Sequence, residues 1–373
     1  MALQPLTVDV LAKKILNNEE VFLLDIRKEE DYEGWAVEGR NVRSLNIPFK
    51  QLESDPGDVK EKLPNDQPVY VVCARGISSQ KAVDLLKEAG LEEVTYLEGG
   101  MTSWSEHLEP VKIGDLNGKG ELYQFLRLGK GCLSYMIIAN GEAAVVDANR
   151  MTGHYEEFAK KQNVTIKHVL DTHLHADHIS GGKELADQNG ATYWFPKQDD
   201  VGVEFSYSAL EDGKEISVGG VTIAAFYSPG HTIGSTSFIV DQEYLLTGDI
   251  LFVQSIGRPD LAGKAEDWVE DLRQTLYNRY KEVSQDLTVL PAHFGKMEEI
   301  NEQGTVQAKL EDLYKKNDRL QVEDESEFRH LVTDNLPPQP NSHEEIRKTN
   351  MGKKQPDADE RREMEVGPNR CAV

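Results

Sequence analysis

The first third of the chain alternates short apolar runs with one segment of clear helical periodicity. Residues 21–25, 69–72 and 94–97 are rich in branched and aromatic side chains, so each predicts a buried strand. Residues 79–89 place apolar side chains on one helical face, and Gly90 follows where a helix commonly ends. Strands that alternate with helices predict a parallel sheet with helices on both faces.

The pattern changes after Pro110, where a loose polar stretch rich in glycine is interpreted as a linker. Beyond it, apolar runs alternate with helical segments in an order that suggests two sheets packed face to face with helices outside. The predicted strands are 134–138, 143–146, 169–171, 222–227, 236–240 and 288–290, and the predicted helices are 155–162, 182–189 and 268–280. The predicted fold class is therefore α/β in both parts. The expected divisions are a first domain (1–110), a linker (111–120), a second domain (121–335) and a C-terminal extension (336–373) that wraps around or is disordered.

Composition limits the classes of function. The net charge is −24, and the excess of acidic residues is spread along the chain, which disfavours nucleic-acid phosphates and anionic membranes as partners. No apolar run is long enough to span a bilayer, and the first residues do not have a signal-peptide layout. Three widely spaced cysteines form neither a disulfide framework nor a paired-cysteine zinc site. We therefore expect a cytoplasmic protein with reduced thiols.

A cluster of candidate metal ligands follows the predicted strand at 169–171. His173, His175, Asp177 and His178 lie within six residues and precede a glycine pair, Gly181-Gly182. A loop at a strand end can direct several such side chains to one point, and imidazoles with carboxylates suit zinc, iron or manganese. A chance cluster on a solvated turn is the alternative, but only ten histidines occur in the whole chain.

Three single residues extend this cluster, and each stands at the end of a predicted strand. They are His231 in SPGH, Asp249 in LLTGD and His293 in VLPAH. Each alone is more typical of a turn residue or a satisfied core histidine. In this order, however, the set resembles the metallo-β-lactamase superfamily, over residues 120 to 295. The resemblance implies an αββα sandwich that gathers these residues at one edge.

Within that superfamily the sequence resembles the glyoxalase II branch and, more closely, the persulfide dioxygenases. The latter resemblance implies one Fe(II) per chain, held by His173, His231 and Asp249. The remaining residues, His175, Asp177, His178 and His293, then form a second metal site or support the first. The same set would serve two zinc ions in a thioesterase, so the ligands alone leave the metal open.

Other residues near this cluster are candidates for substrate contacts or support. The segment containing Arg258 and Asp260 is similar to a Gly-Arg-x-Asp segment of the dioxygenases, although an ordinary surface loop would look the same. Cys132 begins a predicted strand, where it is either a small core residue or a thiol that meets the substrate. Cys371 stands near the C-terminus and is able to fold back to the site.

A separate site is predicted at Cys73, between the strand at 69–72 and the helix at 79–89. A thiolate there would face backbone N–H groups and the positive end of a helix, and Arg75 adds a positive charge. A phosphatase would need arginine at position 79, which is serine. The surroundings, LDIR with DY, NIP, and LEGG before Trp104, resemble the rhodanese family, so Cys73 is expected to carry sulfane sulfur. The loop ends in two serines where many sulfurtransferases have arginine.

The leading hypothesis is a fusion that couples persulfide oxidation by O2 to sulfur transfer at Cys73. Its small-molecule partners would be a thiol persulfide, thiosulfate or sulfite, and O2. The alternative is a dinuclear zinc hydrolase of glutathione thioesters, and a third hypothesis is a sulfur carrier with a structural metal. The family resemblance further implies a homo-oligomer, either a dimer or a tetramer.

Overall fold

The computed structural model describes residues 3–117, 120–259, 265–334, 336, 339 and 341–369, with the backbone only for 265–267. The chain forms two compact units, and the main boundary lies between Glu109 and Pro110. We call them the cysteine domain and the metal domain, and we describe each by itself. In the part of the chain described, no helix is both long and apolar enough to cross a membrane.

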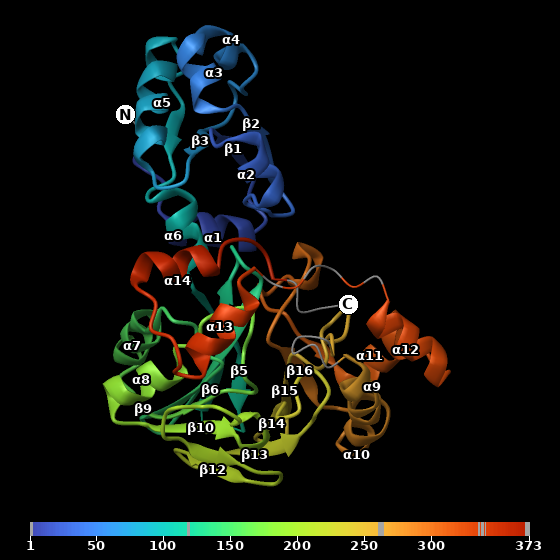
Figure 1. The fold of residues 1–373 in the computed structure, drawn as a ribbon. Coiled ribbons are helices and arrows are strands. Elements are labelled where there is room, and N and C mark those ends of the chain that lie inside the picture. The colour runs from blue at the N-terminus through green and yellow to red at the C-terminus, as the bar shows by residue number, and fades with distance from the viewer. Residues whose placement is uncertain are drawn as a thin grey trace. The chain divides into compact units, whose positions relative to one another are not determined.

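The cysteine domain is built on a four-stranded parallel sheet flanked by helices (Figure 1). The strands, in the order β2-β1-β3-β4, are β1 (Val21–Asp25), β2 (Val42–Asn46), β3 (Val69–Val72) and β4 (Val94–Tyr96). The helices are α1 (Val8–Leu16), α2 (Glu29–Gly34), α3 (Phe49–Ser54), α4 (Pro56–Glu61), α5 (Ile77–Glu88) and α6 (Gly100–Glu106). Helix α5 packs on β3 and β4 and begins two residues earlier than predicted. The predicted parallel α/β sheet is confirmed.

The metal domain contains two mixed sheets. The seven-stranded sheet has the order β11-β10-β9-β8-β7-β6-β5, and the six-stranded sheet runs from β12 to β17 in sequence order. The first comprises β5 (Glu109–Leu116), β6 (Gly120–Arg127), β7 (Cys132–Ala139), β8 (Glu142–Val146), β9 (Thr165–Leu170), β10 (Thr192–Pro196) and β11 (Ser208–Leu210). The second comprises β12 (Glu215–Val218), β13 (Val221–Tyr227), β14 (Thr236–Val240), β15 (Tyr244–Gly248), β16 (Thr288–Pro291) and β17 (Ala308–Lys309).

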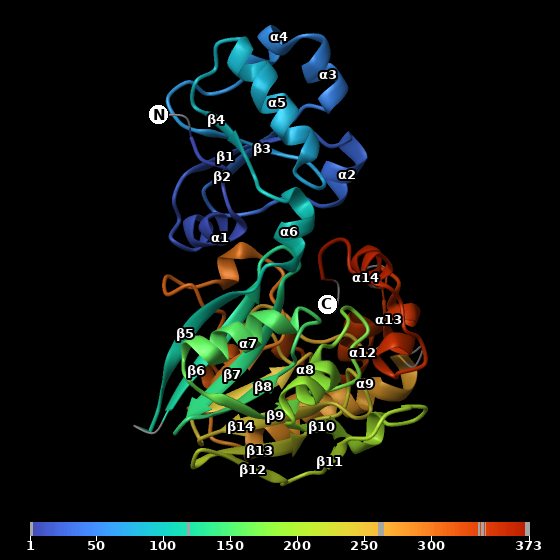
Figure 2. The same cartoon turned by 90° about the vertical axis from the view of Figure 1, so that its left-hand side faces the viewer.

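Helices cover the outer faces of both sheets, which confirms the αββα arrangement (Figure 2). The first pair, α7 (Thr152–Lys161) and α8 (Gly182–Asn189), packs on β9 of the seven-stranded sheet. The six-stranded sheet is covered by α9 (Ala265–Gln274), α10 (Tyr280–Glu282), α11 (Leu310–Lys316) and α12 (Glu325–Thr333). Every residue of β7 is buried, as expected for a strand with both faces covered, which explains its continuous apolar sequence.

The segment 111–120 is not the linker that its sequence suggests. Strand β5 continues to Leu116, and the chain turns at Asn117, whose φ is 40°, before β6 begins at Gly120. The error has a physical cause, because β5 is the edge strand of its sheet and most of its side chains are partly or fully exposed. Gly114 marks a close approach, since a Cβ there would lie 2.6 Å from the Tyr244 hydroxyl.

The helix predicted over 268–280 is present but is interrupted by a π-helical turn at Thr275–Arg279. The Thr275 hydroxyl donates a hydrogen bond of 2.7 Å to the carbonyl oxygen of Pro229. Pro229 lies two residues before His231, so this turn fastens the helix to the loop that carries a candidate ligand. Such single π turns are frequent at functional sites.

The described part of the C-terminal extension wraps around the metal domain. It forms α13 (His343–Asn350) and α14 (Ala358–Met364), and α14 begins with a capping box between Asp357 and Glu360. Ile346 and Met364 pack with Ile179, which directly follows the histidine cluster. The wrap-around alternative is therefore the correct one for residues 341–369.

Candidate metal centre and cysteine site

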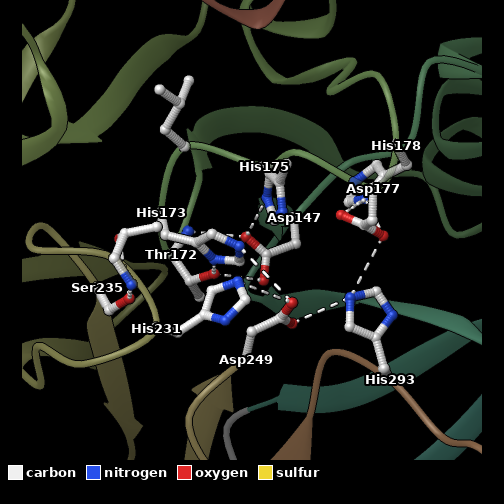
Figure 3. A network of polar contacts seen from close by, with 12 residues as sticks. Asp147, Thr172, His173, His175, Asp177, His178, His231, Ser235, Asp249 and His293 are labelled. Carbon is white, nitrogen blue, oxygen red and sulfur yellow. Dashed lines mark hydrogen bonds and ion pairs between the residues drawn. The ribbon is translucent and has the colours of Figure 1, made fainter. Parts of the chain in front are cut away.

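The predicted metal residues come from four loops that meet in the metal domain (Figure 3). His173, His175, Asp177 and His178 follow β9, and the other three residues follow β13, β15 and β16. All seven side chains are buried, and none is more than 2% exposed. The fold therefore assembles residues that lie up to 120 positions apart in the sequence.

His173, His231 and Asp249 form the first group. Their potential ligand atoms all lie within 4.8 Å of one another. The Oδ2 atom of Asp249 is 3.4 Å from Nε2 of His231 and 3.8 Å from Nε2 of His173. Two imidazoles and one carboxylate on one face are the donor set of a mononuclear site with open positions.

The hydrogen bonding of this group fits a metal ion. Among the described residues, the buried Nε2 atoms of His173 and His231 have no hydrogen-bond partner, and the Oδ2 atom of Asp249 has none either. Buried polar atoms are nearly always satisfied, so such orphans need an explanation. A bound cation would satisfy all of them at once.

The electrostatics of the group also favour a cation. Burial lowers the pKa of His173 well below its ordinary value and lowers that of His231, which keeps both imidazoles neutral. Burial alone would raise the pKa of Asp249, but the charge and the hydrogen bond of His293 outweigh it and hold the pKa below its usual range. Neutral imidazole and ionised carboxylate are the forms that bind metals.

His175 contacts an acidic residue that the sequence analysis missed. Its Nε2 atom lies 3.2 Å from Oδ1 of Asp147, at the end of β8, while its Nδ1 atom has no partner among the described residues. Burial lowers the pKa of His175, but the hydrogen bond and charge of Asp147 raise it to about 9. Asp147 also accepts hydrogen bonds from the amide and hydroxyl of Thr172, at 2.7 and 3.0 Å. Asp147 therefore orients both the motif loop and His175. The position of Asp147 directly after the predicted strand 143–146 was the feature of the sequence that could have identified it.

Replacing Asp147 by alanine is expected to weaken metal binding by about 10- to 100-fold, because it removes an acceptor that orients the ligand loop. Competition with a chromophoric chelator would measure this affinity. Asp241→Ala is the matched control, because Asp241 has a similar left-handed backbone (φ 51° against 55°) in an exposed turn outside the site. Equal affinities in the two variants would contradict the assignment.

A second group consists of Asp177, His293 and the shared Asp249, again with ligand atoms within 4.8 Å. The Nε2 atom of His293 lies 3.0 Å from Asp249 Oδ1 and 3.4 Å from Asp177 Oδ2. Cys132 belongs to this region, since its Sγ atom is 3.6 Å from Asp177 Oδ2 and groups with Asp177 and His178. The structure thus places the Cys132 thiol beside the metal cluster.

The backbone of Arg258 supports the centre. The Nδ1 atom of His231 lies 2.8 Å from the carbonyl oxygen of Arg258, which fixes the ring with Nε2 towards Asp249. Arg258 is only 1% exposed, so the surface-loop alternative is wrong. A Cβ on the preceding Gly257 would lie 1.8 Å from the Asp249 carbonyl oxygen, which explains the glycine. Asp260 and Cys371 lie outside the described residues.

Asp199 is a second residue that the sequence analysis missed. Its Oδ2 atom accepts hydrogen bonds from the Leu174 amide at 2.9 Å and the Thr232 hydroxyl at 2.7 Å. Its Oδ1 atom accepts from the Gly234 amide at 2.8 Å. The buried carboxylate therefore ties the loop of His173 to the loop of His231. No local pattern marks this role, because Asp199 lies in a short 3₁₀ turn after β10.

The C-terminal extension fastens the motif loop from outside. The side-chain amide of Asn350 donates to the carbonyl oxygens of His175 and His178, at 3.0 and 2.9 Å. Glu365 accepts from the Ile179 amide at 2.7 Å and pairs with Arg150 at 2.6 Å. No local sequence pattern predicts these contacts, because they join segments more than 170 residues apart.

In the cysteine domain, the Cys73 sulfur lies at the N-terminus of α5. The Gly76 amide donates to Sγ at 3.1 Å, and the Ser79 hydroxyl lies 3.4 Å from Sγ. One backbone N–H group of the predicted cradle therefore contacts the sulfur. Arg75 lies in the same loop and is exposed.

The glycine pair before α6 closes the cradle from the other side. A Cβ on Gly100 would lie 2.2 Å from the Cys73 carbonyl oxygen, and a Cβ on Gly76 would lie 2.8 Å from the Gly99 amide nitrogen. All three glycines have φ between 59° and 81°. The Cys73 loop and the start of α6 can pack this closely only because these three positions are glycines, which have no Cβ.

Comparison with known proteins agrees with the division into two domains. Residues 7–107 match the rhodanese-like domain family, and residues 128–285 match the metallo-β-lactamase superfamily. Thiosulfate sulfurtransferase GlpE from Pseudoalteromonas translucida is 34% identical over 92 residues, covering 24% of this chain and 79% of the relative. Hydroxyacylglutathione hydrolase from Brucella anthropi is 30% identical over 104 residues, covering 28% and 40%. The crystal structure of ETHE1 from Myxococcus xanthus superposes with a TM-score of 0.54 at 22% identity, covering 62% of this chain and 99% of that one.

A cysteine cradle and a candidate metal centre, each on its own α/β domain, define a two-domain protein with two distinct chemical sites. The chain belongs to both families, as a fusion of a rhodanese-like domain with a metallo-β-lactamase-superfamily domain.

Proposed function

We propose that this fusion oxidises a low-molecular-weight thiol persulfide with O2 at a single Fe(II) and transfers sulfane sulfur at Cys73. The persulfide, O2 and water would yield the thiol, sulfite and two protons. The observation that carries the proposal is the pairing of a sulfur cradle with a buried group of two histidines and one aspartate in one chain.

The metal domain would bind the ion through His173, His231 and Asp249. A ferrous ion so held supplies redox chemistry towards O2 and open positions for a thiolate substrate. The chain itself fixes the donors, because Arg258 orients His231 and the hydroxyl of Thr172 lies 2.9 Å from Nδ1 of His173. Burial of all these groups keeps bulk water away from a reactive persulfide.

Cys73 would exchange sulfur with the product of the metal domain. Its thiolate attacks the sulfane sulfur of thiosulfate, a new S–S bond forms, and sulfite leaves with the electron pair of the broken bond. In reverse, sulfite attacks the Cys73 persulfide and gives thiosulfate. The Gly76 amide and the N-terminal end of α5 stabilise the negative sulfur in both directions.

A dinuclear zinc thioesterase is the second candidate, and the group of Asp177, Asp249 and His293 favours it. Two measurements separate the candidates: the metal content of the purified protein and O2 consumption with glutathione persulfide. One iron per chain with persulfide-dependent O2 uptake supports the dioxygenase. Two zinc ions, or no uptake by the iron-loaded protein, would exclude it.

A further inference from the structure

The C-terminal segment after α14 contacts residues of the second group of candidate metal ligands. The side-chain amide nitrogen of Asn369 lies 2.7 Å from Oδ2 of Asp177. The same nitrogen lies 2.9 Å from Nδ1 and 3.3 Å from Nε2 of His293, and 3.8 Å from the Cys132 sulfur. One amide group thus touches two of the three residues of the second group and the neighbouring thiol.

The two groups of candidate ligands differ in how their polar atoms are satisfied. Nε2 of His173 and Nε2 of His231 have no hydrogen-bond partner among the described residues. Asp177 instead accepts from Asn369 and lies 3.1 Å from Nδ1 of His178, while Nδ1 of His293 lies 2.9 Å from the Asn369 amide nitrogen. The first group is therefore open to a cation, whereas Asp177 and His293 of the second already have polar partners. Beside them, Nε2 of His178 has no partner among the described residues.

An amide N–H is suited to this role. An ion bound by Asp177 and His293 would need a lone pair from Oδ2 of Asp177 and from Nε2 of His293, the ring nitrogen that faces both carboxylates. The Asn369 amide nitrogen lies 2.7 Å and 3.3 Å from these two atoms. The partial positive charge of the N–H satisfies the carboxylate as a cation would, but it brings no open coordination position. The donor is held in place because Glu365, four residues earlier, is fastened to Ile179 and Arg150.

We infer that Asn369 seals the second metal position, so that the centre binds one ion through His173, His231 and Asp249. The inference deepens the proposed function and rests on it for the choice of this group as the occupied one. The C-terminal extension would then determine how many metal ions the centre binds. One ion fits persulfide oxidation, whereas two ions fit thioester hydrolysis. Asn369 is a positioning residue in this account, because it acts through Asp177 and His293.

Titration of the metal-free protein with Co²⁺, followed by its visible absorption and by equilibrium dialysis, tests this without any activity assay. The full-length protein should bind about one Co²⁺ per chain, and Asn369→Ala should bind about two, with a second spectral phase. A truncation that removes residues 366–373 but keeps Glu365 should behave like Asn369→Ala. Asn341→Ala is the matched control, because Asn341 is in the same extension and is exposed. Among the described residues, its side chain makes one weak hydrogen bond of 3.5 Å, to the Glu363 carbonyl oxygen.

Unchanged stoichiometry in both Asn369 variants would overturn the inference, as would two ions in the unaltered protein. Persulfide-dependent O2 uptake by the unaltered iron protein is measured in parallel. A gain of a second Co²⁺ without any O2 uptake supports the seal and refutes the proposed function. If the unaltered protein takes up O2 but the Asn369 variants bind no second Co²⁺, the role of Asn369 is refuted and the proposed function stands.

Discussion

Replacing Asp249 by alanine is expected to abolish metal binding at the centre and, with it, persulfide-dependent O2 uptake. Asp249 belongs to both candidate groups and is the carboxylate nearest to the orphan nitrogens of His173 and His231. Its loss removes the only negative charge of the first group, so the activity should fall by far more than the 10- to 100-fold typical of residues outside the ligand set. Metal analysis and an oxygen electrode give the two readouts.

Asp241→Ala is again the control for this variant. Asp241 directly follows β14 as Asp249 follows β15, but it lies in an exposed turn, where it accepts a hydrogen bond from Asn117. We expect this control to keep its metal and its O2 uptake. A metal-loaded, active Asp249→Ala protein would show that the ion is held elsewhere. Sulfur transfer from thiosulfate should survive in Asp249→Ala, since Cys73 belongs to the other domain.

Replacing Cys73 by serine is expected to have the opposite outcome. Sulfur transfer from thiosulfate to cyanide should fall by at least about 10⁴-fold, because a hydroxyl cannot carry sulfane sulfur and the covalent step is lost. Metal content and O2 uptake should be unchanged. Loss of both activities together would contradict the division of labour between the domains.

Ser79→Ala is the matched control within the same loop. It keeps the thiol and the Gly76 amide donor, and it removes only the hydroxyl 3.4 Å from Sγ. A hydrogen bond of this kind contributes about 1 kcal/mol, so we expect about a fivefold loss of sulfur transfer. A loss as large as that of Cys73→Ser would instead indicate that the loop has collapsed.

Both domains were predictable because their signals are local. Strands such as β1, β3 and β7 are short apolar runs, and the loop from His173 to His178 carries four candidate metal ligands within six residues. The cradle of Cys73 follows from a strand, a glycine loop and a helix in immediate succession. The resemblance of these motifs to two families then identified the fold of each domain.

The edge strand β5 was missed because a strand at the edge of a sheet needs few apolar residues. Its glycine and polar side chains are typical of a linker when they are taken in sequence alone. Pairing with β6 and the approach of Tyr244 to Gly114 become visible only in three dimensions.

The sequence by itself therefore determined the two fold families, the cysteine cradle and the seven candidate ligands. Only the tertiary structure showed that Asp147 orients His175, that Asp199 joins two ligand loops, and that Asn369 contacts Asp177 and His293. These contacts join residues 25 to 192 positions apart. Such pairs have no periodicity or spacing that a linear pattern can reveal, because only the folded chain brings them within hydrogen-bonding distance.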